Sequence, residues 1–472
     1  MRSENVKVAE IVVNNTVAGA ASRSPSIAVF LSFLWPGLGQ LYQGRRRTAA
    51  LYGLPVLAAV LIVVVQLLGG IERFAATLLD PTVALTLVIL VVLLAIWRLF
   101  SMADALFGGD RRSPPPRRVV VPLFAGLAAL VILSHAWVGT VTWAFYDAGS
   151  QIFVGDKGPD ATPSTNETPD PSSNEIDFQA TPFPTPPTTS KRISILVTGI
   201  DSGHGREHAL TDTIMLVSVD PDTGKVAMLS FPRDISNFPL YGGGTYKGKI
   251  NSLMTYARFH PDQFPDGGLP TLAKEVGYLA GVPIQYFAAI NLEGFQKMID
   301  VVGGVDVVNP KRIDDPHYDW FDGTKGFQLK AGPVHLNGKN GLAYVRSRQG
   351  TGDNDFTRAA RQQQVLSALR KKLTDPGVLA RLPELLKAVG SSIRTNYPSD
   401  QVRDLVDMAS KVSDDTTEKK VLGPPYAVHP PTNTTGGVYI LQLDMGRMAK
   451  LSVAVFGADS RYAETGTASP PP

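Results

Sequence analysis

The sequence predicts an α/β domain with a mixed central sheet, preceded by an all-α region that crosses a membrane several times. Three observations support this fold class. The first third of the chain holds long apolar runs that are almost free of charge. A segment dense in Pro, Thr and Ser follows them. Beyond it, short β-rich runs alternate with stretches of helical periodicity, a pattern typical of layered α/β/α domains.

Composition excludes several classes of function. The 472 residues carry a net charge of +3, which is too small to indicate binding to nucleic acid. The sequence contains no recognisable nucleic-acid-binding motif, and we expect no nucleic-acid partner. It also contains no cysteine, which excludes disulfides, thiolate zinc sites and cysteine nucleophiles.

Three apolar runs, at 49–68, 83–96 and 119–145, are about long enough to cross a bilayer. A further run at 27–42 is shorter and is interrupted by proline and glycine. That run fits either a true span or a re-entrant or surface helix, so three and four spans both remain open. Because more spans follow it and no small-residue cleavage site stands out, we expect no cleavable signal peptide.

The arginines that flank these runs predict the orientation of the chain. Clusters precede the runs at 49–68 and 119–145, and the positive-inside rule places both clusters in the cytoplasm. The final span then leads outward, so everything after about residue 150 is expected outside the cell. The arginines concerned are Arg45, Arg46, Arg47, Arg111, Arg112, Arg117 and Arg118.

A linker is predicted where the membrane region ends, because Pro, Thr, Ser and acidic residues dominate there and cannot bury a core. The predicted organisation is a membrane region over 1–150, a linker over 151–190, an extracytoplasmic domain over 191–458 and a disordered tail over 459–472.

Periodicity places the elements of the C-terminal domain. Continuous β-rich runs predict strands at 193–200, 213–219, 225–231, 284–290 and 305–308, the second and third joined in a hairpin. Helical patterns predict helices at 269–279, 293–302, 356–372, 377–395 and 398–412. Shorter apolar runs predict strands at 342–345, 437–443 and 451–456, and residues 309–330 are expected to form a long surface loop.

Basic side chains gather around the strand predicted at 342–345 and the helix predicted at 356–372. Two arginines follow the strand, where period-two geometry would put both on one face. Two more and a glutamine occupy helix positions i, i+3 and i+4, which also share a face. Arginine suits phosphate because its planar fork binds two oxygens and keeps its charge. The pattern indicates a site for a multiply charged anion, the alternative being a solvated basic helix face bridged to nearby aspartates. The residues are Arg346, Arg348, Arg358, Arg361 and Gln362.

Two aspartates lie at the ends of neighbouring predicted strands. Asp201 ends the first strand and Asp212 opens the second, so both carboxylates can lie at one edge of the sheet. Two carboxylates, with phosphate oxygens and water, are the usual ligands of Mg²⁺. Taken singly, an aspartate at a strand end is more often a turn or cap residue. Arg233, Asp234 and Lys249 add further charges nearby, and the alternative for the Arg233–Asp234 pair is a local salt bridge.

Four segments in this order together resemble the LytR–CpsA–Psr family: LVTGID at 196–201, TDTIML at 211–216, FPRD at 231–234 with KIN at 249–251, and YVRSR to DFTRAARQQ at 344–363. Members of that family are membrane-anchored, extracytoplasmic phosphotransferases. They move a glycopolymer from a polyprenyl-pyrophosphate lipid onto peptidoglycan and leave the lipid phosphate behind. The resemblance therefore implies a polyprenyl-(pyro)phosphate donor, a peptidoglycan acceptor and a Mg²⁺ cofactor.

The resemblance also implies roles for individual residues. It implies that Asp201 and Asp212 bind Mg²⁺. It implies catalytic roles for Arg233, Asp234, Arg346, Arg348 and Asp355, and substrate binding by Lys249, Arg358, Arg361 and Gln362. The loop after Asp201 departs from the family, which commonly has an arginine there, and Arg206 is the residue expected to supply that cation from a shifted position. The several spans also exceed the single anchor helix usual in the family.

The implied chemistry is consistent with the location. Phosphoryl transfer needs charge neutralisation and positioning more than covalent assistance. A domain outside the cell has no ATP pool, so its donor must carry its own activation, as a lipid pyrophosphate does. Which of Asp201, Asp212, Asp234 and Asp355 orients the acceptor hydroxyl stays open, as do the glycopolymer and the oligomeric state. The alternative function is a non-catalytic receptor that binds lipid-linked polyanionic glycans and regulates wall assembly.

Overall fold

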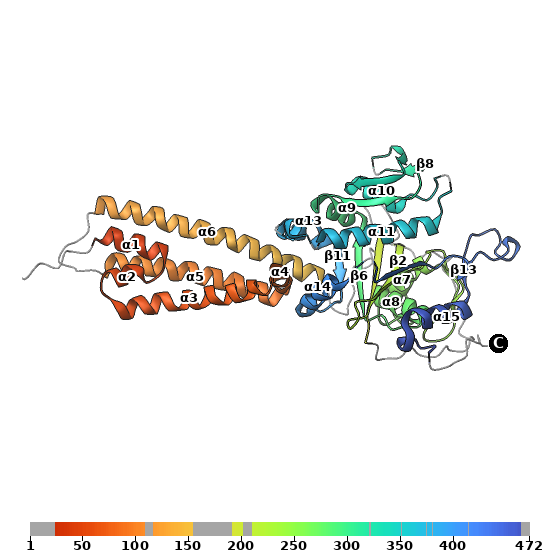
Figure 1. Ribbon diagram of the computed structural model, residues 1–472, viewed down its shortest axis with the longest axis horizontal. Coiled ribbons are helices and arrows are strands. Elements are labelled where there is room, and N and C mark those ends of the chain that lie inside the picture. The colour runs from red at the N-terminus through yellow and green to blue at the C-terminus, as the bar shows by residue number, and fades with distance from the viewer. Residues whose placement is uncertain are drawn as a thin grey trace, which may run out of the picture. The chain divides into compact units, whose positions relative to one another are not determined.

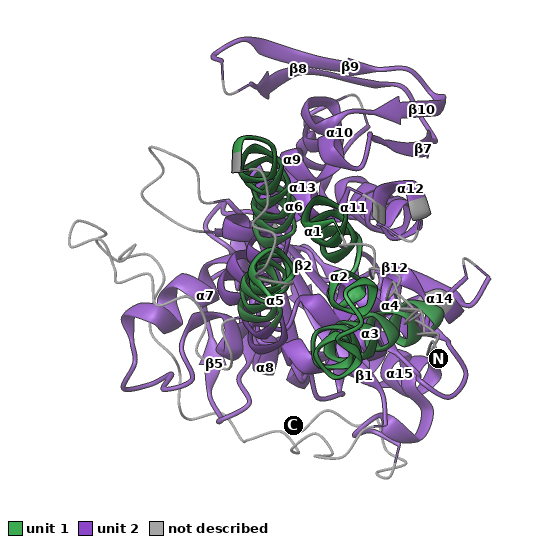
Figure 2. Cartoon of the chain, turned by 90° about the vertical axis from the view of Figure 1, so that its left-hand side faces the viewer, with its two compact units in different colours: residues 1–68, 87–140 green, residues 69–86, 141–472 purple. Residues whose placement is uncertain are grey.

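The structure, a computed structural model, describes residues 24–108, 117–153, 191–201 and 210–463, except positions 321, 351, 374, 380 and 414. Most of the predicted linker and residues 464–472 of the predicted disordered tail lie outside these residues. The chain divides into two compact units, coloured separately in Figure 2. One comprises Met1–Leu68 and Leu87–Thr140, and the other comprises Gly69–Thr86 and Val141–Pro472.

The first unit is built from helices. Its elements are α1 (Pro25–Leu34), α2 (Leu38–Tyr42), α3 (Arg46–Leu68), most of α5 (Pro81–Phe107) and the first part of α6 (Arg117–Ile152). Within the described N-terminal residues, three helices are long and apolar enough to cross a membrane: Arg46–Leu68, Pro81–Phe107 and Arg118–Ile152. The run at 27–42 instead forms α1 and α2, which are 10 and 5 residues long. The chain breaks between them at Gly37, where φ is 99°.

Buried polar side chains hold α2 against α5 in this unit. The Gln40 amide donates to the Ser101 carbonyl oxygen over 2.7 Å and to Asp104 Oδ2 over 3.0 Å. Arg45 donates to both oxygens of the same carboxylate, at 2.7 and 2.9 Å. Such bidentate pairs add geometric specificity to the contact between two helices.

A six-stranded mixed sheet forms the centre of the second unit, with the strand order β11-β6-β1-β2-β3-β12. Its strands are β1 (Ile193–Asp201), β2 (Leu210–Val219), β3 (Val226–Ser230), β6 (Tyr286–Asn291), β11 (Ile393–Thr395) and β12 (Thr417–Val421). β1 pairs antiparallel with β2 and parallel with β6, and β2 pairs antiparallel with β3. The predicted α/β class with a mixed sheet and the predicted β2–β3 hairpin are therefore confirmed.

Helices cover both faces of this sheet (Figure 1). One face packs against α7 (Ile250–Phe259), α8 (Gly268–Ala280) and α15 (Met445–Phe456). The other faces α9 (Leu292–Val301) and α11 (Asp355–Leu373), with α10 (Gly338–Arg346) and α13 (Leu382–Val389) beyond them. Successive residues of a strand point to opposite faces. Accordingly, Ile214 and Leu216 of β2 join the first core, whereas Met215 joins a cluster with Leu366 of α11.

Four two-stranded ribbons complete the domain. They are β4 (Phe238–Pro239) with β5 (Thr245–Tyr246), β7 (Val305–Asn309) with β10 (Gly332–Leu336), β8 (Ile313–Asp319) with β9 (Lys325–Leu329), and β13 (Ala427–Val428) with β14 (Gln442–Leu443). The remaining α-helices are α4 (Ile71–Leu78), α12 (Pro376–Leu379) and α14 (Val402–Lys411). Helix α4 packs against α14, where Arg73 Nε lies 2.6 Å from Asp407 Oδ1.

Several predicted elements are wrong: two short apolar runs predicted as strands are helical, and a segment predicted as a surface loop forms a ribbon. Residues 342–345 are not a strand but belong to α10, whose N-cap Asn337 accepts a hydrogen bond from the Asn340 amide. Residues 451–456 lie in α15, capped in the same way by Asp444. The predicted surface loop at 309–330 forms the β8–β9 ribbon, which packs Tyr318 and Phe327 into a core.

Two other predictions are only partly correct. The helix predicted at 377–395 is divided into α12, α13, a 3₁₀ turn at Gly390–Ser392 and β11. Of the strand predicted at 437–443, only Gln442–Leu443 pairs as a strand, with β13. In both cases an edge partner elsewhere in the chain, rather than local periodicity, defines the element.

A buried carboxyl on α8 makes the stability of this domain depend on pH. Glu275 is 3% exposed, and it accepts a hydrogen bond from the Tyr241 amide over 2.8 Å. Burial raises the pKa of Glu275 from 4.5 to about 7. Between these two pKa values the folded state holds the proton more tightly than the unfolded state. The free energy of unfolding therefore falls as pH rises through this window, by a total on the order of 3 kcal/mol.

We expect the Glu275→Gln variant to be more stable than the wild type at pH 8, with the advantage shrinking towards pH 5. Glutamine keeps an oxygen that accepts from Tyr241 but has no charge to desolvate. Thermal unfolding of the full chain in detergent, from pH 5 to pH 8, measures this difference. Glu384→Gln, at a side chain that is 66% exposed, is the control. A melting-temperature difference that is the same at every pH would contradict the role of Glu275.

Candidate active site

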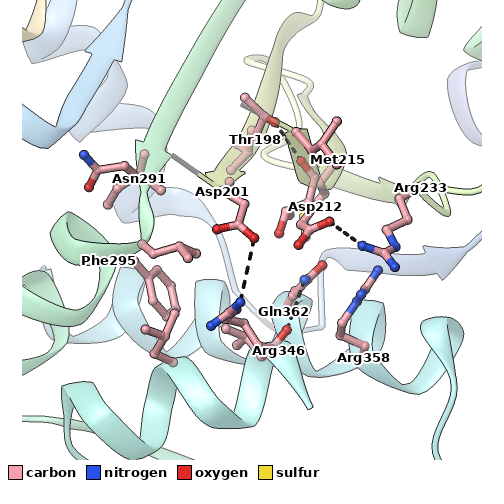
Figure 3. A pocket seen from close by; sticks show the side chains of 18 of the residues that line it. Thr198, Asp201, Asp212, Met215, Arg233, Asn291, Phe295, Arg346, Arg358 and Gln362 are labelled. Atoms are coloured by element: carbon pink, nitrogen blue, oxygen red, sulfur yellow. Dashed lines mark hydrogen bonds and ion pairs between the residues drawn. The ribbon is translucent and has the colours of Figure 1, made fainter. Parts of the chain in front are cut away.

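A β-bulge brings two aspartates to one end of the sheet. Gly199 pairs with Thr213, but the next residue, Ile200, pairs with Thr211, so Asp212 is left between the two pairs. In a regular strand Asp212 would point the same way as Ile214, into the apolar core. The extra residue turns it to the opposite face, as bulges next to functional sites do. Asp201 and Asp212 therefore both line one cavity, confirming that their carboxylates lie at the same edge (Figure 3).

The cavity has a volume of about 600 Å³ and two chemically different parts. Charged and amide side chains gather at the strand ends, whereas apolar side chains of the sheet, α9 and α11 line the rest. Figure 3 shows Phe295 on one side of Asp201, with Arg233 and Arg358 on the other. The polar lining residues are Asp201, Asp212, Arg233, Arg346, Arg348, Arg358 and Gln362, together with Thr198, Thr213, Asn291, Asp315, His317, Asp319 and Gln349. The apolar lining residues include Val197, Met215, Leu292, Phe295, Met298, Leu366, Leu369 and Ile393.

Arg346 and Arg348 reach the cavity from the end of α10 rather than from a strand. Arg346 is the last residue of the helix, and its Nη2 lies 3.7 Å from Asp201 Oδ2. Ser347 then turns the backbone into an extended conformation, with ψ of 137°, and Arg348 follows. Arg348 Nη1 lies 3.8 Å from Asp355 Oδ1, and its side chain is 39% exposed. Both arginines line the cavity as expected, but for a different geometric reason.

Asp315, which sequence reasoning missed, holds this turn in place. Its side chain is buried, with 2% exposure of the residue. Its Oδ2 accepts hydrogen bonds from Ser347 Oγ at 2.7 Å and from the Arg348 and Gln349 amides at 3.2 and 3.1 Å. A carboxylate that accepts three hydrogen bonds fixes the backbone between the two arginines. The residue was hidden from sequence reasoning because it lies in the segment predicted to be a surface loop.

Helix α11 contributes Arg358 and Gln362 to the cavity, but not Arg361. Arg358 is 5% exposed, and its Nη2 lies 2.9 Å from Asp355 Oδ1. Gln362 donates to the Val345 carbonyl oxygen over 3.2 Å, which ties α11 to α10. Arg361 is buried beneath the site, where it donates to the Ser347 carbonyl oxygen over 2.5 Å and lies 3.3 Å from Asp353. Its sequence spacing predicted a shared face, yet the structure uses Arg361 to support the turn at Ser347.

Arg233 is the centre of a partly buried cluster of charges. Its Nη1 donates to Asp212 Oδ1 over 2.7 Å, and its Nε lies 3.7 Å from Asp234 and 3.9 Å from Asp355. Burial alone would lower the pKa of Arg233, but the surrounding carboxylates outweigh burial and raise it. The closest carboxylate to Arg233 is that of Asp212, at 2.7 Å, whereas the sequence neighbour Asp234 lies 3.7 Å away. A local Arg233–Asp234 salt bridge is thus not the main contact of this arginine. Asp234 is instead closest to Lys249, at 2.5 Å.

Burial also shifts the pKa values of Asp355 and Arg358, which form an ion pair on α11. The pKa of Asp355 is raised by burial and by the neighbouring Asp234, despite the opposing effect of Arg358 and Arg233. The pKa of Arg358 is lowered by burial, against the attraction of Asp355. Clusters of shifted groups at a cavity are typical of functional sites.

The structure brings most of the predicted site residues together, but only some of them line the cavity. Asp234, Asp355 and Lys249 do not line the cavity; they lie behind Arg233 and Arg358 as their counter-charges or neighbours. Arg206 lies outside the described residues, so the cation expected there stays a prediction.

The donor set of the cavity fits Mg²⁺. Among the described residues, no group of three or more His, Asp or Glu side chains is placed to hold a metal ion. Mg²⁺ does not require such a cage, because it is commonly bound by one or two carboxylates with phosphate oxygens and water. Asp201 and Asp212 supply two carboxylates that line the cavity, and the arginines beside them suit phosphate.

Comparison with known proteins assigns the family. The LytR_cpsA_psr family model matches residues 159–456. A polyisoprenyl-teichoic acid–peptidoglycan teichoic acid transferase TagU of Bacillus mycoides is 31% identical over 216 residues, which are 46% of this chain and 64% of that relative. The TagU of Halalkalibacterium halodurans is 30% identical over 213 residues, 45% of this chain and 63% of the relative. The match thus spans less than two thirds of these relatives.

Among solved structures, the crystal structure of B. subtilis TagV is similar to this chain, with 24% identity and a TM-score of 0.45. The similarity covers 59% of this chain and 99% of TagV. Because the family model covers more than half of the sequence, the chain belongs to the LytR_cpsA_psr family.

Proposed function

We propose that this protein is a Mg²⁺-dependent phosphotransferase, which moves a glycopolymer from a polyprenyl-pyrophosphate lipid onto peptidoglycan. The observation that carries this proposal is the division of the cavity. A cluster of arginines and aspartates at the strand ends opens directly onto an apolar wall. A ligand that fits such a cavity is an amphiphile with a multiply charged head, and a polyprenyl pyrophosphate has both parts. Relatives named as polyisoprenyl-teichoic acid–peptidoglycan teichoic acid transferases support the same substrate class.

The reaction exchanges a phosphoanhydride bond for a phosphate ester bond. The acceptor hydroxyl oxygen forms a bond to the phosphorus that carries the glycopolymer. The bond from that phosphorus to the bridging oxygen of the pyrophosphate breaks, and the lipid leaves as a monophosphate. The acceptor proton passes to a carboxylate or to water. No oxidant or nucleotide is needed, because the pyrophosphate bond supplies the activation.

Each group at the cavity has a role in this step. Mg²⁺, held by Asp201 and Asp212, would neutralise charge on the pyrophosphate oxygens. Arg346, Arg348 and Arg358 would bind the same oxygens, and they are already fixed by the end of α10 and by Asp355. Groups positioned before the reaction stabilise developing charge without reorganising during it. Asp355, whose pKa burial raises, is a carboxylate suited to accept the acceptor proton.

The membrane region suits this substrate. Three helices of sufficient length and apolar character would keep the domain at the membrane that holds the lipid donor. With arginines at the start of α3 and α6 on the cytoplasmic side, the domain would lie outside the cell with the peptidoglycan acceptor.

Turnover by the full chain tests this proposal. The protein, in detergent, is incubated with a short-chain polyprenyl-pyrophosphoryl sugar, peptidoglycan fragments and Mg²⁺. We expect mass spectrometry to detect polyprenyl monophosphate and a glycan-linked product in equal amounts. Tight binding of the lipid without any product, across several donors and acceptors, would instead favour the receptor function.

We expect turnover to stop on chelation and to return with added Mg²⁺, and Asp201→Asn to need about ten times more Mg²⁺ for half-maximal rate. Removing one of two anionic ligands weakens a site whose remaining ligands are phosphate and water. The measurement is the initial rate against Mg²⁺ concentration. Asp222→Asn, in the exposed hairpin turn between β2 and β3, is the control. An unchanged Mg²⁺ dependence in Asp201→Asn would remove this residue from the metal site.

A further inference from the structure

A loop far along the chain lies next to the charged cluster. Residues 429–441, here called the 429–441 loop, connect β13 to β14 and protrude beyond them (Figure 1). Its last residue is fixed to the segment that carries Arg233 and Asp234. The Leu441 amide donates to the Asp234 carbonyl oxygen, and Leu441 accepts from the Ser236 amide, both over 2.8 Å. Leu441 is 1% exposed, so the base of the loop is anchored in the core.

Two residues before this anchor, the loop presents an aromatic surface to solvent. Tyr439 is 46% exposed, and the neighbouring Val438 is 55% exposed. The ring of His429 stacks on Tyr439 with centroids 4.8 Å apart and an angle of 28°. His429 Nδ1 lies 2.8 Å from the Ile440 carbonyl oxygen, which holds the imidazole in this position. The loop therefore offers a supported, partly exposed aromatic ring rather than a freely rotating one.

The exposed ring lies within electrostatic reach of the charged cluster. Burial raises the pKa of Tyr439, and the Asp355 and Asp234 carboxylates raise it further. These are the two carboxylates that lie behind Arg233, and neither lines the apolar cavity. Arg233 itself lines the cavity and contacts both carboxylates. The loop that carries Tyr439 is thus anchored beside Asp234, one of the two carboxylates that Arg233 contacts.

The composition of the loop indicates an uncharged ligand. From His429 to Ile440 the sequence HPPTNTTGGVYI contains no Asp, Glu, Lys or Arg, although the adjacent site is densely charged. Threonine and asparagine residues lie between His429 and Tyr439 in the sequence and offer hydroxyl and amide groups. An aromatic face beside such groups matches a sugar ring, whose C–H groups pack on the ring while its hydroxyls and amides form hydrogen bonds.

We propose that the 429–441 loop is the acceptor subsite, where Tyr439, supported by His429, packs against a sugar ring of a peptidoglycan glycan strand. This inference rests on the proposed function and adds the side from which the acceptor enters. In-line displacement requires the attacking and leaving oxygens on opposite sides of phosphorus. With the donor lipid in the apolar cavity, the leaving phosphate lies towards that cavity. The acceptor hydroxyl then approaches from the side of Asp234, Asp355 and Tyr439.

The test compares Tyr439→Ala, Tyr439→Phe and wild type in the full chain, using N-acetylglucosaminyl-N-acetylmuramyl fragments of peptidoglycan as the acceptor. We expect Tyr439→Ala to raise the KM for the acceptor about tenfold, because a ring contact of this kind corresponds to roughly that factor. The kcat and the KM for the lipid donor should stay within about twofold. Tyr439→Phe keeps the ring and should behave like the wild type. Val308→Ala, at another exposed apolar side chain, is the matched control.

A measurement of acceptor binding in the absence of the lipid donor tests this inference separately from the proposed function. Saturation-transfer NMR with the same fragments, in the absence of donor, reports the Kd for the acceptor directly. We expect Tyr439→Ala to weaken this binding about tenfold as well. Unchanged binding and unchanged acceptor KM in that variant would overturn the acceptor subsite, while leaving the transferase intact. Fragment binding that depends on Tyr439, in a wild type that forms no product, would instead retain the glycan subsite and reject the transferase.

Discussion

Arg346→Ala is expected to lower the rate of the proposed transfer by about 10²–10³-fold, since removing one preorganised charge donor from a reacting site has an effect of this size. The residue stands at the C-terminal end of α10, and its Nη2 lies 3.7 Å from Asp201 Oδ2. It therefore lies beside the expected metal position and would face the pyrophosphate oxygens of the proposed donor. Its side chain is 20% exposed, so much of its interaction takes place away from bulk water.

The measurement is kcat/KM for the lipid donor in the full chain, at saturating Mg²⁺. Arg346→Lys should recover only part of the loss, because an ammonium group cannot bind two oxygens in the planar geometry of a guanidinium. Arg312→Ala removes an arginine whose side chain is 65% exposed, and it should retain the wild-type rate. A rate in Arg346→Ala within tenfold of the wild type would remove this arginine from the transition-state contacts.

Arg233→Ala is expected to destabilise the domain by about 3–5 kcal/mol, the usual effect of removing one partner from a buried charge cluster. Three carboxylates, those of Asp212, Asp234 and Asp355, lie within 4.0 Å of this guanidinium. The variant leaves them with less positive charge in a buried site. For a domain of this size, the loss corresponds to a fall in melting temperature on the order of 10 °C at pH 7.

The destabilisation caused by Arg233→Ala should depend on pH. Asp355 already has a raised pKa, and removing Arg233 removes a charge that opposes protonation. Its folded-state pKa therefore rises further, and lowering the pH protonates the carboxyl and relieves the repulsion. We expect the difference from wild type to narrow between pH 7 and pH 5.

Thermal unfolding of the full chain in detergent measures both effects. The double variant Arg233→Ala/Asp212→Asn should recover part of the loss, because it removes the closest unpaired carboxylate as well. Arg381→Ala, at an ion pair whose two side chains are 52% and 66% exposed, should change stability by less than about 1 kcal/mol. A destabilisation by Arg233→Ala that is independent of pH, with no rescue by Asp212→Asn, would show that lost packing rather than charge is responsible.

The proposed donor and acceptor sides meet at Arg233. This residue lines the cavity that suits the lipid, and it contacts the two carboxylates next to the 429–441 loop. A single guanidinium would thus neutralise the pyrophosphate on one side and position a carboxylate for the acceptor on the other. This arrangement would give Arg233 both a structural and a catalytic role, so its variant should lose stability and activity together.

Local patterns in the sequence were enough to identify many elements of this protein. Apolar runs of span length predicted α3, α5 and α6, because a bilayer requires that length whatever the rest of the chain does. Strand runs that end in charged residues predicted β1 and β2 and placed Asp201 and Asp212 together. The strength of these predictions came from patterns contained within a single element.

The orientation of several side chains depends on contacts with residues far away in the sequence, and only the tertiary structure shows these contacts. The bulge that turns Asp212 into the cavity depends on how β2 pairs with β1, and that register is not visible in the spacing of either strand. Arg361 shares a predicted helix face with Arg358, yet it lies beneath the site, where it donates to the carbonyl oxygen of Ser347, the residue after α10. Four apolar residues before Arg346 fit a strand as well as a helix, and the Asn337 cap selected the helix.

The same reason explains the residues that sequence reasoning overlooked. Asp315 and Tyr439 lie in segments without clear periodicity, and each acquires its role through contacts with residues 32 to 34 positions away or, for the 429–441 loop, about 200 positions away. The sequence by itself determined the fold class, the apolar helices of span length and the arginine-rich and aspartate-rich character of the cavity, because each depends on local composition and period. The tertiary structure alone decided which of these charges face one another and where an acceptor could approach, because both depend on long-range pairing.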